Sequence, residues 1–354
     1  MIVVIPSSRH IELSHLAPLI DEGVRFVVVD DSEGTITLDH PQFTVLNWAD
    51  RRRILGDLDH AIPRRNGASR SLGFLIAWRE SEADELIVAL DDDCVVELFD
   101  FAPRVEKLFD GGVSHAAAQS GAFLNILDLY TELDGTRVFP RGFPYSERLD
   151  YRVCTFTEQA PRQVVFNLGL WSGILDVNAV DKIRLPAWNV EQPEFRVPNA
   201  IVPSGSLACL CSMNMQFRRS AIPAIYQLPM HVEVMHDLVI DRYGDIWGGF
   251  ILQLLAARRG ELVSFGGPVI RHLKEGGFER NLWQEHAAHL VNDEFVLLLR
   301  SLTVEISASS YLDMMNELNE ALVERTPRCS PILRAYLRHL THALSGWVKL
   351  LAAG

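Results

Sequence analysis

The sequence lacks the features that mark membrane-spanning, secreted and nucleic-acid-binding proteins. No uninterrupted apolar run approaches the roughly 18–20 residues that a membrane-spanning helix needs. The N-terminal stretch MIVVIPSSRH does not have the basic start, apolar stretch and small-residue cleavage site of a signal peptide. Acidic residues outnumber basic ones by 46 to 33, and the formal net charge of −13 argues against a general nucleic-acid-binding face. We therefore expect a cytoplasmic protein with no nucleic-acid partner and no transmembrane segment.

Cysteine is scarce as well, and two common motifs are missing. The five cysteines are scattered, and Cys209 and Cys211 are too close in sequence for an easy disulfide and have no second pair to complete a zinc site. NGASRSLG (66–73) lacks the Lys-Ser/Thr of a nucleotide-binding P-loop, and HVEVMH (231–236) is not the H-E-x-x-H of a zinc enzyme. A phosphate-bearing ligand would have to be held by another metal, by particular arginines or by backbone amides.

The first hundred residues instead alternate regularly between apolar strands and helical segments. Residues 68–80 carry apolar side chains at helical spacing, and the expected strands are IVVIP (2–6), FVVVDD (26–31), FTVLNW (43–48) and LIVAL (86–90). This alternation predicts an α/β fold with an open, mostly parallel sheet and flanking helices. Ligands of such sheets bind at the carboxyl ends of the strands, which lie here at residues 6–9, 30–31 and 91–93.

The remainder of the chain divides into a loop-rich part and a helical part. Residues 115–235 are less periodic, and we interpret them as short strands and loops that build an acceptor or sugar pocket. Residues 246–260 predict a helix, and a strand then ends at His272. Helical spacing dominates from about residue 283 to the end of the sequence. We therefore predict a body of residues 1–290 with a C-terminal helical extension, residues 291–354, packed on it.

Three consecutive acids, Asp91, Asp92 and Asp93, follow the apolar strand LIVAL. Side chains alternate along a strand, so Asp91 and Asp93 are expected to point one way and Asp92 the other. Carboxylates in this position suit Mg²⁺ or Mn²⁺, which prefer oxygen ligands and bridge phosphates. The alternative is that these acids cap the next helix or make a loop soluble.

Further candidates are single residues with competing explanations. His272 could supply a nitrogen ligand to the same cation or be structural. Arg141 and Arg148 lie seven residues apart in a loop with prolines and aromatics, and a guanidinium can grip phosphate with two hydrogen bonds. Asp245 could cap the helix that follows it or face a sugar. Arg9, Arg53 and Arg70 lie next to the expected strands and helices, where solvated surface positions are the ordinary explanation.

Taken together and in order, these segments resemble the reversibly glycosylated polypeptide / UDP-arabinopyranose mutase family, which has a GT-A type fold. One departure is at Gly244, where the family usually has a second acid before the one at Asp245. The C-terminal helices match only loosely. The stretches that carry the resemblance are VIPSSR (4–9), RILG (53–56), ALDDDCVV (89–96), RGFPYSER (141–148), GLW (169–171), CSMNMQF (211–217), RYGDIWGG (242–249) and LWQE (282–285).

The resemblance implies a metal-dependent mutase that converts the sugar of a nucleotide sugar between pyranose and furanose rings. It implies a Mn²⁺ or Mg²⁺ site at Asp91, Asp93 and His272, and catalytic roles for Arg141, Arg148, Asp92 and Asp245. Arg141 falls on the family's reversibly glycosylated arginine, although we prefer an electrostatic role for it. The predicted nucleotide-sugar-binding residues are Pro6, Ser7, Arg9, Asp30, Asp31, Arg53, Arg70, Asp92, Trp171, Asn214, Asp245, Trp247 and Lys274.

Two other functions use the same kind of site. A glycosyltransferase or self-glycosylating protein would use the same nucleotide-sugar donor, and a non-catalytic subunit could bind it without turnover. A nucleotidyltransferase is disfavoured because the glycine-rich phosphate loop that it normally needs is missing. The residue types do not choose between UDP and GDP, between candidate sugars, or between a monomer and a homo-oligomer.

Overall fold

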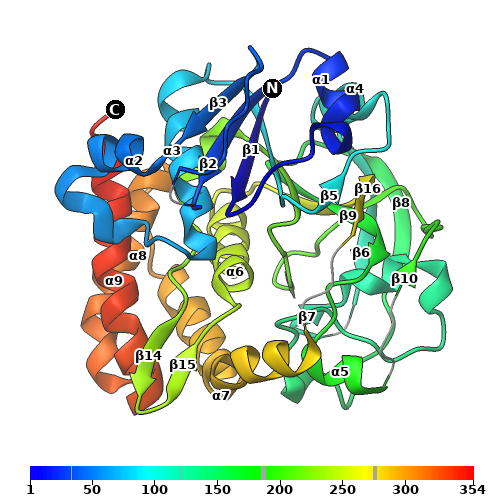
Figure 1. The fold of residues 1–354 in the computed structure, drawn as a ribbon. Coiled ribbons are helices and arrows are strands. Elements are labelled where there is room, and N and C mark those ends of the chain that lie inside the picture. Colours follow the sequence, from blue (N-terminus) through cyan, green and yellow to red (C-terminus); the bar gives the residue numbers. More distant parts are fainter. Residues whose placement is uncertain (33, 120, 185–188, 274–276) are drawn as a thin grey trace.

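A sheet of twelve strands forms the centre of the computed structural model, which describes residues 1–32, 34–119, 121–184, 189–273 and 277–354 (Figure 1). The main path of the sheet runs β3-β2-β1-β4-β13-β9-β16-β11-β6-β8, with β10 paired to β9 and β5 paired to β16. Two short pairs lie outside it, β7 (Phe123–Leu124) with β12 (Leu207–Ala208) and β14 (Val232–Met235) with β15 (Leu238–Ile240). The strands of the large sheet are β1 (Ile2–Ser7), β2 (Arg25–Asp30), β3 (Phe43–Leu46), β4 (Leu86–Leu90), β5 (Cys94–Val95), β6 (Val113–Ala118), β8 (Thr155–Arg162), β9 (Phe166–Ile174), β10 (Asn189–Val190), β11 (Asn199–Ile201), β13 (Asn214–Arg218) and β16 (Val263–His272).

The first four strands of this path pair in parallel, as the sequence predicts. Their side chains are apolar and almost completely buried in β1, β2 and β4, as expected for strands covered on both faces. The register pairs Ser7 with Asp30, so β1 and β2 end at the same edge. Helix α3 (Arg70–Glu80) packs on both strands, and a side chain at Gly73 would collide with Val4. The carboxyl ends of these strands therefore form one continuous edge.

The second half of the sheet brings a late strand back to the aspartate triplet. Strand β16 runs parallel to β9 and antiparallel to β5, and the β5 register pairs His272 with Cys94. The amide of Leu273 donates to the carbonyl of Asp93 at 3.1 Å. His272 therefore lies beside residues that are about 180 positions earlier in the chain, because β5 directly follows the triplet.

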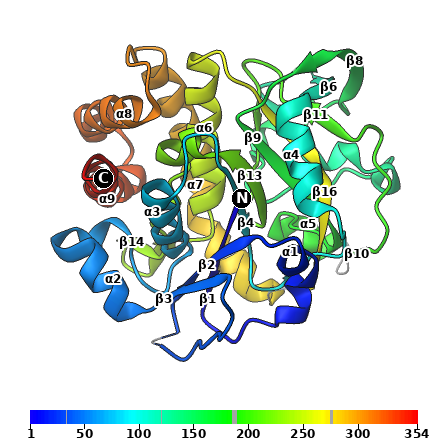
Figure 2. The same cartoon turned by 90° about the horizontal axis from the view of Figure 1, so that it is seen from above.

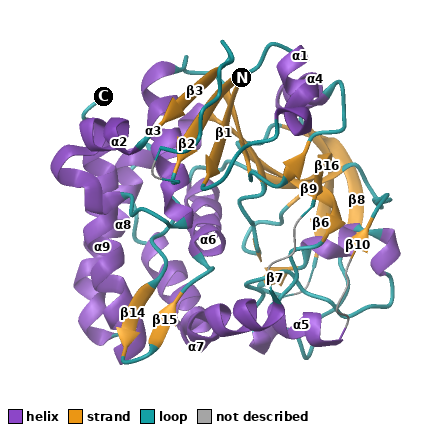
Figure 3. Cartoon of the chain, in the orientation of Figure 1, coloured by secondary structure: helices purple, strands orange, loops and turns teal. Residues whose placement is uncertain are grey.

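Helices cover the sheet on both sides, as Figure 2 and Figure 3 show. Helix α4 packs against β16, whereas α3 and the last helix, α9, pack on each other. The α/β class, the open sheet, the flanking helices and the C-terminal helices predicted from the sequence are thus confirmed. The helices are α1 (Ala17–Asp21), α2 (Trp48–Leu55), α3, α4 (Phe101–Gly111), α5 (Ala179–Arg184), α6 (Gly244–Arg258), α7 (Phe278–Thr303), α8 (Tyr311–Arg325) and α9 (Pro331–Ala352).

The C-terminal helices are joined to the body through α7. The predicted boundary between residues 290 and 291 lies inside this helix. Helix α9 is long and amphipathic, and its Trp347 is buried, stacks on Tyr226 and donates its indole N–H to the carbonyl of Pro223. Among the helices that the structure describes, none is both long enough and apolar enough to cross a membrane.

Candidate active site

Two adjoining cavities open at the carboxyl edge of the sheet. The strand-end cavity, about 650 Å³, is lined by residues at or just after the carboxyl ends of β1, β2 and β4, among them Pro6, Ser7, Asp31 and Asp92. The acid cavity, about 400 Å³, has in its lining a cluster of ionisable side chains: Asp91, Asp93, Asp176, Asp241, Asp245, Arg141, Arg242, Lys182 and His272. Asp91, Gly67 and Ser212 line both cavities. The predicted ligand-binding edge therefore contains a continuous pair of hollows.

The aspartate triplet is held by two arginines. The guanidinium of Arg70, at the start of α3, forms an ion pair with Asp91 and donates to the carbonyl of Leu90 at 3.0 Å. Arg9 forms an ion pair with Asp92, and its Nη2 atom lies 3.1 Å from Asp93. These contacts relieve the repulsion between the three carboxylates, but two cations leave one negative charge unbalanced.

The predicted alternation holds for Asp92 and Asp93. Asp92 lines the strand-end cavity, where it also accepts a hydrogen bond from Ser7 Oγ at 2.5 Å, and Asp93 lines the acid cavity. Asp91 lines both cavities, so it is not confined to one side of the chain. Burial and the neighbouring Asp93 raise the pKa of Asp91, and Arg70 acts in the opposite direction.

The chemistry of these side chains fits a hard divalent cation. His272 Nδ1 lies 2.7 Å from the carbonyl of Ile174, so this nitrogen donates, and Nε2 is the nitrogen that a neutral ring would offer to a metal. Nε2 lies 3.8 Å from Asp93 Oδ1, so a neutral Nε2 and this carboxylate oxygen would be able to bind one cation together. Within the described residues, no three His, Cys, Asp or Glu side chains are already close enough to form an assembled metal site.

Arg141 occupies a closed cage of acceptors. Its Nε and Nη2 atoms contact Asp176, at 3.1 and 2.9 Å, and its Nη1 and Nη2 atoms donate to the two oxygens of Asp245, at 3.0 and 2.8 Å. Nη1 also donates to the carbonyl of Arg242. Burial would lower the pKa of Arg141, but the two carboxylates outweigh it and hold this pKa well above its ordinary value. All the N–H groups of this guanidinium are therefore directed at protein acceptors.

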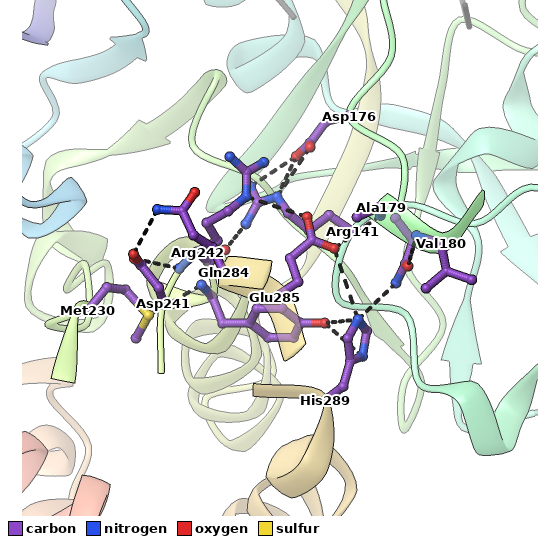
Figure 4. A network of polar contacts seen from close by, with 12 residues as sticks. Arg141, Asp176, Ala179, Val180, Met230, Asp241, Arg242, Gln284, Glu285 and His289 are labelled. Atoms are coloured by element: carbon purple, nitrogen blue, oxygen red, sulfur yellow. Dashed lines mark hydrogen bonds and ion pairs between the residues drawn. The ribbon is translucent and has the colours of Figure 1, made fainter. Parts of the chain in front are cut away.

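Arg242 comes next in the same network (Figure 4). Its backbone lies in the left-handed region, with φ of 62°, and its Nε atom lies 3.4 Å from the buried Glu285. Glu285 in turn accepts a hydrogen bond from the amide of Ala179 at 3.0 Å and lies 4.0 Å from His289. Burial raises the pKa of Glu285 and lowers the pKa of His289 to about 4. This network connects the wall of the acid cavity to helix α7.

Comparison with known proteins gives the family. The sequence profile of the reversibly glycosylated polypeptides matches residues 2–353. The chain belongs to this family. A probable UDP-arabinopyranose mutase 1 from Pisum sativum is 26% identical, over 98% of this chain and 89% of its own length. UDP-arabinopyranose mutase 3 from Arabidopsis thaliana is 25% identical over 99% and 91%, and UDP-arabinopyranose mutase 1 from Oryza sativa subsp. japonica is 25% identical over 98% and 89%.

Arg148, the second loop arginine of this reversibly glycosylated polypeptide, lies outside the lining of the acid cavity. Arg148 Nη1 contacts Asp181 at 3.1 Å, and the guanidinium lies over the rings of Phe139 and Tyr145. Its Nε and Nη2 atoms are buried and have no hydrogen-bond partner in the part of the chain that the structure describes. Arg148 is not among the residues that line the cavity, so its predicted catalytic role requires an effect through its neighbours or a rearrangement of the loop.

Several predicted binding residues lie away from both cavities. The side chain of Arg53 is 73% exposed on α2 and pairs with Asp50. Trp171 and Trp247 are core residues, and Trp247 donates its indole N–H to Asn292. Two polar residues are internal: Asp30 accepts from Ser32 in a tight turn, and Asn214 donates to the carbonyl of Pro268. Lys274 lies outside the described residues.

Sequence reasoning missed four charged residues of the network: Asp176, Asp241, Arg242 and Glu285. A signal existed for Asp176, since it follows the buried strand β9 as Asp91 follows β4. Arg242 is the first residue of the RYGDIWGG stretch and Asp241 directly precedes it, but only Asp245 and Trp247 were selected from this stretch. Glu285 ends the LWQE stretch that matched the family, but its role depends on partners at residues 179 and 242, which no local pattern places beside it.

Proposed function

We propose that this reversibly glycosylated polypeptide is a metal-dependent mutase that interconverts the pyranose and furanose forms of a UDP- or GDP-bound sugar. The observation that carries the proposal is that the two cavities adjoin at the aspartate triplet. A nucleotide sugar fits this arrangement with its nucleoside in the strand-end cavity, its diphosphate at the triplet and its sugar in the acid cavity. Family membership and relatives named as mutases support the same reaction.

Ring contraction makes specific chemical demands on such a site. The bond between C1 and the diphosphate oxygen breaks, and the C4 hydroxyl oxygen bonds to C1 and loses its proton. The former ring oxygen is released from C1 and takes up a proton to become the C5 hydroxyl, and the diphosphate oxygen then returns to C1. The product is an isomer, so no atom is gained or lost. A divalent cation held by Asp91, Asp93 and His272 would make the diphosphate a better leaving group by neutralising its developing charge.

The reaction also develops positive charge at C1 of the sugar, and the protein's own side chains can stabilise it. Asp176, Asp241 and Asp245 line the acid cavity, and fixed carboxylates stabilise a nearby cationic centre. In this scheme Arg141 holds Asp176 and Asp245 in place. The sequence-based idea that Arg141 grips the departing diphosphate requires it to exchange these carboxylates for phosphate oxygens.

The test is a turnover screen of UDP- and GDP-pyranoses with Mn²⁺, with Mg²⁺ and with a chelator, followed by chromatography. We expect a new sugar isomer without free nucleotide, and loss of turnover in the chelator. Asp93→Asn should abolish the response to metal, whereas Asp92→Asn should leave a response with altered substrate affinity. Absence of metal-dependent isomer formation across the panel would refute the proposal.

The same screen separates the rival functions. A glycosyltransferase or self-glycosylating protein would release free nucleotide and transfer the sugar to an acceptor or to itself. A non-catalytic subunit would bind the nucleotide sugar and return it unchanged.

A further inference from the structure

Two arginines line the acid cavity, and they differ in the hydrogen-bond donors that they can offer to a ligand. The N–H groups of Arg141 are directed at Asp176, at Asp245 and at the carbonyl of Arg242. A phosphate oxygen could reach Arg141 only by displacing a carboxylate that would then be buried without its cation. Arg141 is therefore poorly suited to grip a ligand directly.

Arg242 offers what Arg141 lacks. Its Nε atom lies 3.4 Å from Glu285 Oε1, an ion pair without a hydrogen bond, and its two Nη groups form no hydrogen bond with the described residues. The Arg242 side chain is 28% exposed, and it lines the same cavity as Asp91, Asp93 and His272. A guanidinium with two free Nη groups has the geometry to bind two phosphate oxygens at once.

The backbone at Arg242 is held in an unusual conformation. Its φ of 62° is rare for a residue with a side chain. The structure secures both ends of the residue, since its N–H donates to Asp241 Oδ1 at 2.8 Å and its carbonyl accepts from Arg141. Left-handed residues of this kind persist only where the surroundings hold them, and they are common at ligand sites. The contact with Arg141 therefore fixes the direction from which the Arg242 side chain leaves the chain.

Glu285 supports the side chain itself. It is only 1% exposed, it comes from α7, and its other oxygen accepts the amide of Ala179 at 3.0 Å. Glu285 therefore lies on the Nε side of the guanidinium as an ion-pair partner, which leaves the Nη edge for a ligand. It is a positioning residue, because its effect on a ligand would pass through Arg242.

We infer that Arg242 is the side chain that binds the diphosphate of the nucleotide sugar, with Glu285 and Arg141 as its positioning residues. The inference rests on the proposed function for the identity of the ligand. It places one cation of the protein opposite the metal site, with the diphosphate between them.

The experiment compares calorimetric titrations of UDP, GDP, uridine and guanosine into the full chain with Mn²⁺ present. Arg242→Met should weaken binding of the preferred nucleoside diphosphate about 10- to 100-fold, since a hydrogen-bonded charge is lost, and leave nucleoside binding unchanged. Arg242→Lys should lose less affinity for the diphosphate, because lysine keeps the positive charge although it cannot form the bidentate contact. Arg104→Gln is the matched control, since Arg104 is exposed on α4 and pairs with the exposed Asp100, away from both cavities.

The role of Glu285 is tested in the Arg242→Met background. Glu285→Gln should weaken diphosphate binding in the otherwise unchanged protein and have no further effect when Arg242 is absent. A purely structural role of Glu285 would give the same loss in both backgrounds. Circular dichroism spectra verify the fold of each variant, and if Arg242→Met does not fold, the Lys variant decides.

The outcomes separate this inference from the proposed function. If Arg242→Met and Arg242→Lys bind the diphosphate as the unchanged protein does, the assignment is wrong even where mutase turnover is found. If the unchanged protein binds the diphosphate through Arg242 but forms no sugar isomer, the assignment stands and the mutase proposal fails. Absence of nucleoside diphosphate binding by the unchanged protein overturns the assignment.

Discussion

Arg141→Met removes the cation that two buried carboxylates share, and its cost in stability can be worked out from the structure. The side chains of Asp176 and Asp245 are each 12% exposed. Removing one partner of a buried ion pair costs about 3–5 kcal/mol. The entropy of unfolding of a chain of 354 residues is roughly 0.7 kcal/mol/K. We therefore expect the melting temperature to fall by about 4–7 °C.

The sign of the pH dependence follows from the carboxylate. Burial acts to raise the pKa of Asp176, but Arg141 outweighs it, so in the unchanged protein this pKa is below its ordinary value. The stabilisation is therefore present above an ordinary aspartate pKa of about 3.9 and is lost only below it. Without Arg141, burial dominates and the pKa of Asp176 rises. As the pH falls, Asp176 is then protonated, and the variant no longer has to keep an unpaired charge buried. The deficit of Arg141→Met should be smaller at pH 5 than at pH 8.

Scanning calorimetry at the two pH values measures both effects. The triple variant Arg141→Met, Asp176→Asn, Asp245→Asn should recover most of the loss, because replacing a whole buried ion network with neutral groups is often neutral for stability. The reasoning is refuted if Arg141→Met melts at the temperature of the unchanged protein at pH 8. It is also refuted if the deficit is the same at both pH values.

Two further predictions concern stability. Burial, with a contribution from Arg148, lowers the pKa of His289 to about 4. Since the unfolded chain binds this proton more tightly, the free energy of unfolding should decrease between pH 6.5 and pH 4 by on the order of 3 kcal/mol, and His289→Gln should flatten that part of a denaturant-derived pH profile. A profile that is equally steep in the variant would contradict this. Gly244→Ala should cost about 1–3 kcal/mol in urea titrations, since its Cβ would lie 2.4 Å from the carbonyl oxygen of Leu228. Gly111→Ala, whose Cβ would meet nothing within 4 Å, is the control, and equal stability of the two variants would disprove the clash.

Local sequence patterns were sufficient to predict the parallel strands that carry the candidate site. Continuous apolar runs such as Ile2–Ser7 and Leu86–Leu90 predicted buried parallel strands, because a strand covered on both faces has no polar side. Since parallel strands end at one edge, the acids that follow them could be placed together in advance. Ser7, Asp31 and Asp92 do line one cavity.

Local patterns failed where a side chain's direction decides its role. Trp171 and Trp247 belong to stretches that matched the family, yet both point into the core. Arg53 matched as well and is solvated. A matching motif shows that a segment resembles the family. Whether a side chain in that segment points into the core, into a cavity or into solvent depends on the neighbouring strands and helices.

The sequence by itself determined the α/β class and the edge of the sheet at which the acids after the parallel strands gather, because these depend on periodicity over a few residues. Only the tertiary structure decided which charges meet across long separations. Arg141 contacts Asp176 and Asp245, which are 35 and 104 residues away. Arg242, in the loop before α6, contacts Glu285 of helix α7. Those pairings depend on the order of strands in the sheet and on how α7 packs, and no local pattern encodes either. The closed cage around Arg141 and the open Nη groups of Arg242 are for that reason visible only in the folded chain.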